Sequence, residues 1–190
     1  DDSFIDQITF NESHDRDPVV LDSGSDSGTI MFSSWAHLGP KNQFNLFTVN
    51  PDGTDMFVKY GAFSPGNSRI HPRVLPEGPH KGKVISALMP LSGTQEGGAL
   101  VLMDVENFSE NDDPVDPSTS GSGQFLPAPF NDETFFNNMN VDPLDPPVRL
   151  ANPYPLRDGT NRVLMAFSRS TVTTGLDGLG NPKTEEAPHY

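Results

Sequence analysis

The residues best suited to chemistry gather first in one charged run, His14-Asp15-Arg16-Asp17. Imidazole is a common metal ligand, so this run could bind a metal ion together with two later histidines, His37 and His71. No pair of these histidines has the i, i+2 or i, i+4 spacing of strong metal motifs. We therefore assign no metal site, and keep His14, His37 and His71 as candidates that only the fold could bring together.

The same charged run also has a structural interpretation. Arg16 can form a bidentate bridge with an aspartate, and Asp17 can brace the turn before Pro18. Because the run stands where a recurring segment begins, we favour a clamp between neighbouring elements over a binding cluster. Trp35, the only tryptophan, is expected to pack in the core or at its rim.

Acidic residues at two turn-like segments raise the question of calcium. Asp52 and Asp55 flank Gly53, but an EF-hand loop needs more ligands and a closing glutamate, so turn chemistry explains them better. A second acidic stretch contains Asp112, Asp113 and Asp116. A solvated run of charges explains this stretch, and loose calcium binding stays open.

No catalytic constellation can be assembled from the sequence. Gly24-Ser-Asp-Ser-Gly28 has Asp26 where a nucleophile elbow needs serine. The chain contains no cysteine, which excludes disulfides, cysteine–zinc sites, thiol nucleophiles and covalently attached c-type haem. We therefore name no catalytic and no cofactor-binding residue, and we expect that this chain by itself is not an enzyme.

Composition narrows the partners and the fold class. With 12 basic and 26 acidic residues among 190, the net charge is −14, which argues against nucleic acid and anionic membranes because both attract positive surfaces. The longest apolar runs hold about five residues, far fewer than the roughly 20 that span a bilayer. Glycine and proline, 17 and 19 residues, argue against a helical bundle.

One pattern, Pro-x-x-Leu-x-x-Gly followed by a short turn and an apolar run, occurs three times and is called the proline frame here. It begins at Pro18, Pro72 and Pro153, and each copy predicts a hairpin whose second strand is buried on both faces. After the first copy a second hairpin turns at Asn-Pro-Asp-Gly, so residues 15–60 predict four strands. A four-stranded repeat of roughly 40–50 residues is typical of a β-propeller blade; a β-sandwich is the alternative.

The spacing of the frame divides the chain. We expect an all-β fold of four-stranded antiparallel propeller blades in an incomplete ring, with the end of one blade at 1–14, blades at 15–62 and 63–105, and the start of another at 148–190. Residues 106–147 form an acidic excursion rich in proline, glycine and serine. Its aromatic anchors, expected to contact a partner, are Phe125, Phe130, Phe135 and Phe136. Since a ring needs four or more blades, we expect a piece of a larger propeller.

Two sets of motifs carry a family resemblance. Asn50-Pro-Asp-Gly-Thr54 after Leu46-Phe-Thr-Val49 resembles the blades of TolB-like propellers. The segment from Ile8 through the charged run to Trp35-Ala-His37, together with Gly97-Gly-Ala-Leu-Val-Leu-Met-Asp104, is similar to the middle propeller domain of hydrazine synthase alpha subunit-like proteins. The similarity covers most of residues 8–105 and 148–168.

The resemblance implies an exported protein, periplasmic, extracellular or on the outer surface, whose partners are other domains or subunits, multihaem cytochromes among them. Haem in that family is held by Cys-x-x-Cys-His motifs, which this chain lacks, so any haem would lie on another domain or subunit. Three functions stay open. They are a non-catalytic propeller scaffold or interaction segment, the propeller domain of a haem-containing redox enzyme, and a TolB-like module that binds a peptide or protein.

Overall fold

The computed structural model describes residues 5–38, 41–66, 68–89, 97–125, 149–168, 172–176 and 178–185. In these ranges all the regular elements are strands, and the strands pair antiparallel, which confirms the prediction of an all-β protein. Over the same ranges, no helix is long and apolar enough to cross a membrane.

The first sheet contains the four strands that were predicted over residues 15–60. In order across the sheet they are β1 (Asp15–Val20), β2 (Ile30–Leu38), β3 (Lys41–Val49) and β4 (Phe57–Tyr60). The predicted turn joins β3 to β4, where the backbone N–H of Gly53 donates to the carbonyl of Asn50 at 2.9 Å. Gly53 has a φ of 82°, a conformation that glycine adopts without steric cost.

The second sheet differs from the expected division of the chain. Its strands, from one edge to the other, are β5 (Ser68–Val74), β6 (Val84–Met89), β7 (Ala99–Met103) and β10 (Gln124–Phe125). Its fourth strand therefore comes from the stretch expected as an excursion, and the boundary expected at residue 105 falls too early. A strand edge needs a hydrogen-bonding partner, and the polar composition averaged over 106–147 concealed the short strand that supplies it.

Two further strands, β8 (Phe108–Glu110) and β9 (Asp113–Pro114), form a small hairpin between β7 and β10. Phe108 is only 4% exposed and belongs to the core between the first two sheets, as does Val105. This part of the expected excursion thus packs against the sheets.

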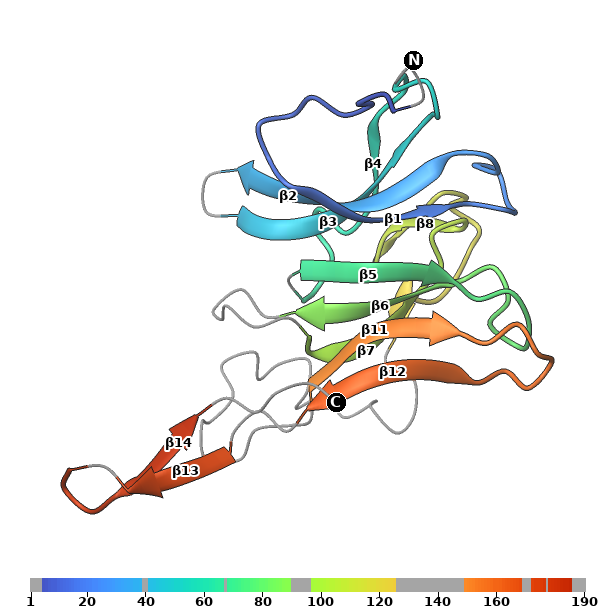
Figure 1. Cartoon of the computed structure of the whole chain (residues 1–190). Helices are drawn as coiled ribbons and strands as arrows, with labels where there is room; N and C mark the ends of the chain where they lie inside the picture. Colours follow the sequence, from blue (N-terminus) through green and yellow to red (C-terminus); the bar gives the residue numbers. More distant parts are fainter. Residues whose placement is uncertain are drawn as a thin grey trace.

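The third proline frame forms the predicted hairpin. It pairs β11 (Arg149–Pro155) with β12 (Val163–Ser168), and the described residues that follow form a separate pair, β13 (Val172–Leu176) and β14 (Pro182–Glu185). In Figure 1 the β13–β14 hairpin stands away from the other sheets.

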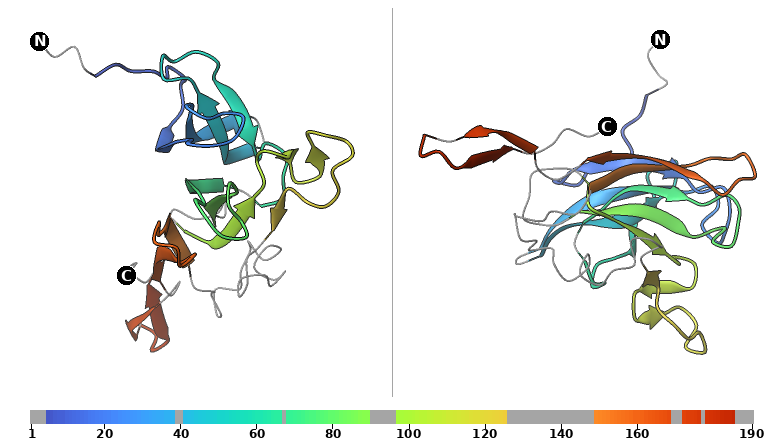
Figure 2. Two further views of the ribbon diagram at one scale, coloured as in Figure 1. Left: turned by 90° about the vertical axis from the view of Figure 1, so that its right-hand side faces the viewer. Right: turned by 90° about the horizontal axis from the view of Figure 1, so that it is seen from below.

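The first sheet, the second sheet and the β11–β12 sheet stack in this order (Figures 1 and 2). Strand β5 contacts both β1 and β11, so the frame strands of the three sheets lie side by side. Residues alternate in direction along β6 and β7: Val84 and Val101 pack in the core toward the first sheet, whereas Ile85 and Leu100 pack in a second core with Leu150. Burial on both faces explains why these strands are continuously apolar in sequence.

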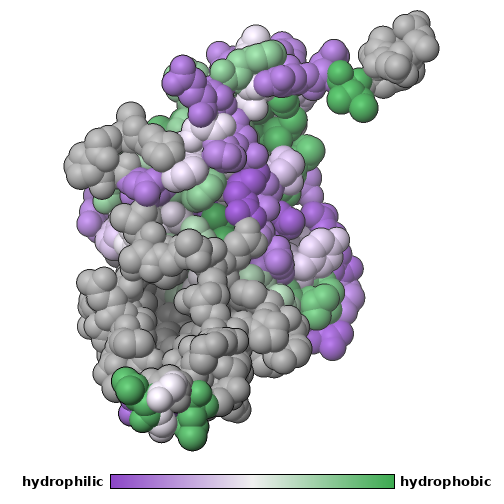
Figure 3. Space-filling model, turned by 60° about the vertical axis from the view of Figure 1, so that its left-hand side comes forward, coloured by the Kyte–Doolittle hydropathy of each residue, from purple (hydrophilic) through white to green (hydrophobic). Residues whose placement is uncertain are grey.

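On the face drawn in Figure 3, the hydrophobic residues form small separate patches among hydrophilic ones. The cores between sheets are therefore where most of the apolar side chains of the described strands are buried.

Candidate functional site

The residue that precedes each frame proline occupies the same unusual place in its strand. Asp17, His71 and Asn152 have φ values of 57°, 55° and 51°, and the pairing of each frame strand shifts register there. The left-handed conformation is uncommon for residues with a side chain, but Asp, Asn and His adopt it several times more often than others. This preference explains why the three copies of the frame carry Asp, His and Asn at this position.

These three residues form what we call the inner-strand ladder. The Asp17 carboxylate accepts the backbone N–H of His71 at 3.1 Å, and Nδ1 of His71 lies 3.4 Å from the backbone nitrogen of Asn152. The side chain of one frame thus receives the backbone N–H of the equivalent residue in the next. Nδ1 of His71 is placed to accept the backbone N–H of Asn152, and its Nε2 lies 3.7 Å from Oδ1 of Asp17.

Arg16 joins the ladder from the first sheet. Its Nε donates to Oδ2 of Asp17 at 3.0 Å, and its Nη2 lies 3.4 Å from Nε2 of His71. The side chain of His71 is 4% exposed, so the charged contacts lie in a largely dry interface. The predicted clamp between neighbouring elements is confirmed for Arg16 and Asp17.

The three histidine candidates have different surroundings. His14 lies with its ring 5.3 Å from that of Trp35, whereas His71 belongs to the inner-strand ladder. His37 is in β2, and its side chain lies outside the described residues. Where side chains are described, no group of three or more His, Cys, Asp or Glu could hold a metal ion.

Trp35 is a packing residue, as expected. Its ring stacks on Phe44 with the centroids 5.8 Å apart, and its indole N–H donates to Asn42. The residue is half-buried at the rim of the first sheet.

The acidic turns also follow their predicted chemistry. Asp52 accepts both the backbone N–H and the hydroxyl of Thr54, at 3.0 and 2.7 Å, and the hydroxyl contact is the main cause that lowers the pKa of Asp52. Asp116 accepts the same two groups of Ser118. These carboxylates therefore cap their own turns.

Strands β1, β5 and β11 enclose a cavity of about 350 Å³, which we call the axial cavity. It is lined by two or three residues from each proline frame, among them Val19, Arg73 and Tyr154. Arg157 closes it from the third frame and bonds Asp22 of the first, with both guanidinium nitrogens 3.2 Å from Oδ2. Equivalent positions of three repeats thus build one site.

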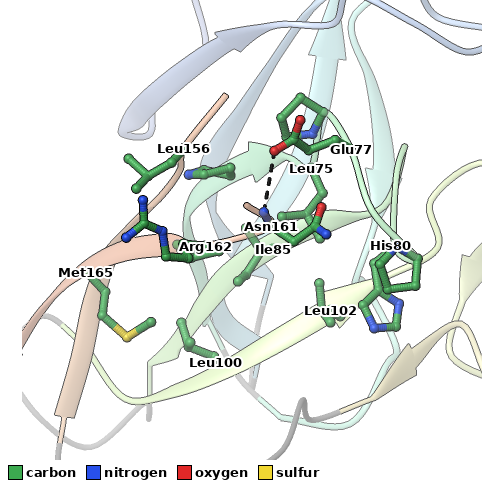
Figure 4. A pocket seen from close by; sticks show the side chains of 14 residues that line it. Leu75, Glu77, His80, Ile85, Leu100, Leu102, Leu156, Asn161, Arg162 and Met165 are labelled. Atoms are coloured by element: carbon green, nitrogen blue, oxygen red, sulfur yellow. Dashed lines mark hydrogen bonds between the residues drawn. The ribbon is translucent and has the colours of Figure 1, made fainter. Parts of the chain in front are cut away.

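A second cavity, of about 370 Å³, lies between the second sheet and the β11–β12 sheet; we call it the intersheet pocket (Figure 4). Its walls are mainly aliphatic, with Ile85, Leu100 and Met165 among them. At its mouth Glu77 accepts the backbone N–H of Gly159 at 2.8 Å, which ties the turns of two frames together. Such a lining suits binding of an apolar group more than proton transfer.

Phe125 borders this region from β10. Its ring packs against the core that contains Ile85 and Leu100, 5.3 Å from the ring of His80 and 5.9 Å from the ammonium of Lys83. Phe125 is partly buried on its own sheet, and its expected contact with a partner stays a prediction. The other three expected anchors, Phe130, Phe135 and Phe136, lie outside the described residues.

Sequence reasoning missed Arg69, a fully buried cation in β5. Its Nη2 donates to the carbonyl of Pro65 and to the side chain of Gln124, each at 2.8 Å, and its guanidinium lies 5.6 Å from the ring centroid of Tyr60. Burial lowers the pKa of Arg69 to about 10, so it stays charged at neutral pH, and burial raises the pKa of Tyr60 to about 12. Its strand, Ser-Arg-Ile-His-Pro-Arg-Val, mixes polar and apolar residues and gave no sequence signal that Arg69 is buried.

Lys83 and Asp104 form a second ionic contact that the sequence did not reveal. Lys83 directly precedes β6 and Asp104 directly follows β7, the neighbouring strand, and Nζ of Lys83 lies 2.7 Å from Oδ2 of Asp104. Partial burial acts to raise the pKa of Asp104, but hydrogen bonds from Lys83 and Asn107 outweigh it, so the pKa lies below its ordinary value.

No protein-family model, curated protein or solved structure matches this chain. The resemblance to TolB-like and hydrazine synthase alpha-like propellers therefore stays a prediction from the quoted motifs.

Proposed function

We propose that this chain is a β-propeller segment that acts as a non-catalytic scaffold, holding other domains or subunits of an exported protein through the faces of its sheets. The observation that carries the proposal is the inner-strand ladder. The same contact, from the side chain of one frame residue to the backbone N–H of the next, joins the first sheet to the second and the second to the third.

The arrangement of the sheets supports a propeller over a sandwich. In a β-sandwich two sheets pack together and each keeps one outer face. Here the second sheet is buried on both faces, and its frame strand contacts the frame strands on either side. Such serial stacking around adjacent inner strands is how propeller blades are arranged.

The two cavities favour a scaffold as the role of the segment. Their polar groups hold the frames together: Glu77 binds the turn of the third frame, and Arg157 binds Asp22 of the first. These groups are engaged in positioning sheets, which is the work of a scaffold.

The proposal is tested by an experimental structure of the protein in its native assembly. We expect β1, β5 and β11 to line one axis and another sheet to cover the β11–β12 sheet. An assembly in which the three sheets form an isolated stack, with no partner on any sheet face, would contradict the proposal.

The axial cavity favours a second candidate function, the binding of a peptide along the axis. It combines apolar walls with the cation Arg73, which suits an acidic side chain or a free carboxyl terminus; the second cation, Arg157, is engaged by Asp22. An array of short peptides with free or amidated ends would test this. Binding that requires the free carboxylate and is lost in Arg73→Ala, but not in Arg162→Ala, is the expected result; equal binding to both peptide types would argue against it.

A further inference from the structure

The two ends of the sheet stack present faces whose counterparts inside the stack are buried. The strand register establishes which residues are equivalent. The residue two places after the left-handed residue of each frame pairs with the second residue of the apolar strand, and the three pairs are Val19↔Met31, Arg73↔Ile85 and Tyr154↔Leu164. Residues directly opposite each other in a sheet point to the same face, so each pair marks the face that its sheet turns toward the next.

This forward face is buried in the first two sheets and open in the third. Met31 is 0% exposed and lies in the core shared with the second sheet, and Ile85 is 4% exposed and lies in the core shared with the third. Their equivalent Leu164 is 64% exposed, and its neighbour Tyr154 is 58% exposed. Leu164 thus stands exposed where the frame elsewhere buries its equivalent, and Tyr154 is exposed where its equivalents Val19 and Arg73 are half-buried.

The opposite, backward face shows the complementary pattern. The pairs that mark it are Val20↔Ile30, Val74↔Val84 and Pro155↔Val163. Val84 is buried against the first sheet with Val74 beside it, and Val163 packs against the core of the second sheet. On the first sheet, Val20 is 63% exposed and Ile30 is half-buried.

We propose that the forward face of the third sheet, at Tyr154 and Leu164, binds the backward face of the first sheet, at Val20 and Ile30, on a second copy of this chain. The proposal rests on the scaffold function proposed above and names the partner of its sheet faces. The two faces lie at opposite ends of the stack (Figure 1), so the contact is head-to-tail.

A second copy fits because this chain itself carries both halves of the contact. Leu164 and Val20 would share a core in the new contact, as their equivalents Met31 and Val74 share the core between the first and second sheets. Each copy contributes three stacked sheets, and two copies contribute six, within the four to eight that close a propeller. A head-to-tail contact that closes on itself produces a finite ring rather than a filament.

The inner-strand ladder extends across the same contact. Asn152 is exposed and occupies the frame position from which Asp17 and His71 accept a backbone N–H of the following sheet. Its side-chain carbonyl can accept the N–H of Asp17 of the second copy, which would repeat the ladder a third time.

The first test measures the mass of the whole 190-residue chain by sedimentation velocity between micromolar and 100 μM, in salt that screens its charge of −14. We expect a dimer of the 20.7 kDa chain. Leu164→Glu should weaken dimerisation by about a hundredfold or more, because the contact would bury an unpaired carboxylate. Val115→Glu is the matched control, since Val115 is 66% exposed in the β9 region and should leave the dimer intact.

The second test uses the absence of cysteine. Val20→Cys and Leu164→Cys are prepared as separate proteins and treated with a short bismaleimide. Mixed together, they should yield a covalent dimer in quantity, whereas each variant alone should yield little, since the same face does not meet itself. Preferential crosslinking of Leu164→Cys with itself would overturn the head-to-tail contact.

A folded chain that stays at 20.7 kDa at 100 μM, with native circular dichroism and Trp35 emission, would overturn this proposal and leave the scaffold function standing with a different partner. If the native structure instead lacked the stacked sheets, both proposals would fail. Loss of structure in Leu164→Glu would be visible in the same spectra, and the crosslinking pair then decides the question.

Discussion

Replacing Arg69 by methionine tests whether a buried cation holds the first two sheets and the fourth strand of the second together. Arg69 is fully buried in β5. It donates to Pro65 in the connection from the first sheet and to Gln124 in β10, both at 2.8 Å, and lies beside the ring of Tyr60. Arg69→Met keeps an unbranched, flexible side chain of similar volume and removes the guanidinium.

The magnitude follows from these contacts. Each hydrogen bond from a charged donor contributes about 1.5–3 kcal/mol, so the two short ones contribute about 3–6 kcal/mol. Methionine returns about 1–2 kcal/mol, because it packs the same volume without desolvating a charge. The net loss in the free energy of unfolding is about 1–5 kcal/mol, compared with the 5–15 kcal/mol typical of a domain.

The assay is urea unfolding followed by Trp35 fluorescence and by far-ultraviolet circular dichroism, with equal slopes required for a two-state comparison. Arg162→Met is the matched control: Arg162 has a side chain 65% exposed and bonds Asp158 within its own turn, so its loss should stay below about 0.5 kcal/mol. If Arg69→Met lost no more than the control, the reasoning about the buried cation would be wrong.

Three further predictions concern stability, each measured by the same urea unfolding. Gly66→Ala should lower the free energy of unfolding clearly more than Gly82→Ala. Both glycines have positive φ, but the new Cβ at Gly66 would lie 2.7 Å from a methyl of Leu88, whereas nothing lies within 4 Å of the new Cβ at Gly82. Equal losses of stability would contradict the close packing at Gly66. The pKa of Asp104 is depressed in the folded state. The stability that its ionised carboxylate contributes is therefore complete above the unfolded pKa of about 3.9 and disappears as the pH falls through the folded pKa. Asp104→Asn should lower the free energy of unfolding at pH 7 and make that free energy fall less steeply in acid. His71→Leu should cost about 1–3 kcal/mol, since it removes one step of the inner-strand ladder and places leucine in a left-handed conformation, and an unchanged midpoint would show that the ladder is incidental.

The hairpins were predictable because their signals are local. Alternation, turn residues and the proline frame identified all three frame hairpins and the four strands of the first sheet. The boundary at residue 105 was wrong because β10 holds only two residues, and a two-residue strand carries no periodicity. Phe125 shows the same limit, since an aromatic side chain in a polar stretch looks alike whether it packs on its own sheet or on a partner.

The candidate sites were less predictable than the strands. The sequence showed that Asp, His and Asn precede the frame prolines, but the ladder depends on the close approach of residues 17, 71 and 152. Arg69 was missed because an isolated arginine has no pattern, and only the surrounding carbonyls explain its burial. The ion pair of Lys83 with Asp104 likewise depends on which strands are neighbours.

The sequence by itself determined the class of structure and a set of exclusions: an all-β chain of repeated hairpins, acidic, without cysteine chemistry. It did so because hydrophobic periodicity, turn chemistry and composition act over a few residues at a time. Only the tertiary structure decided which face of each sheet is covered, and therefore that Leu164 stands exposed where Met31 and Ile85 are buried. Burial depends on residues distant along the chain, so three copies of one local pattern can have different surroundings.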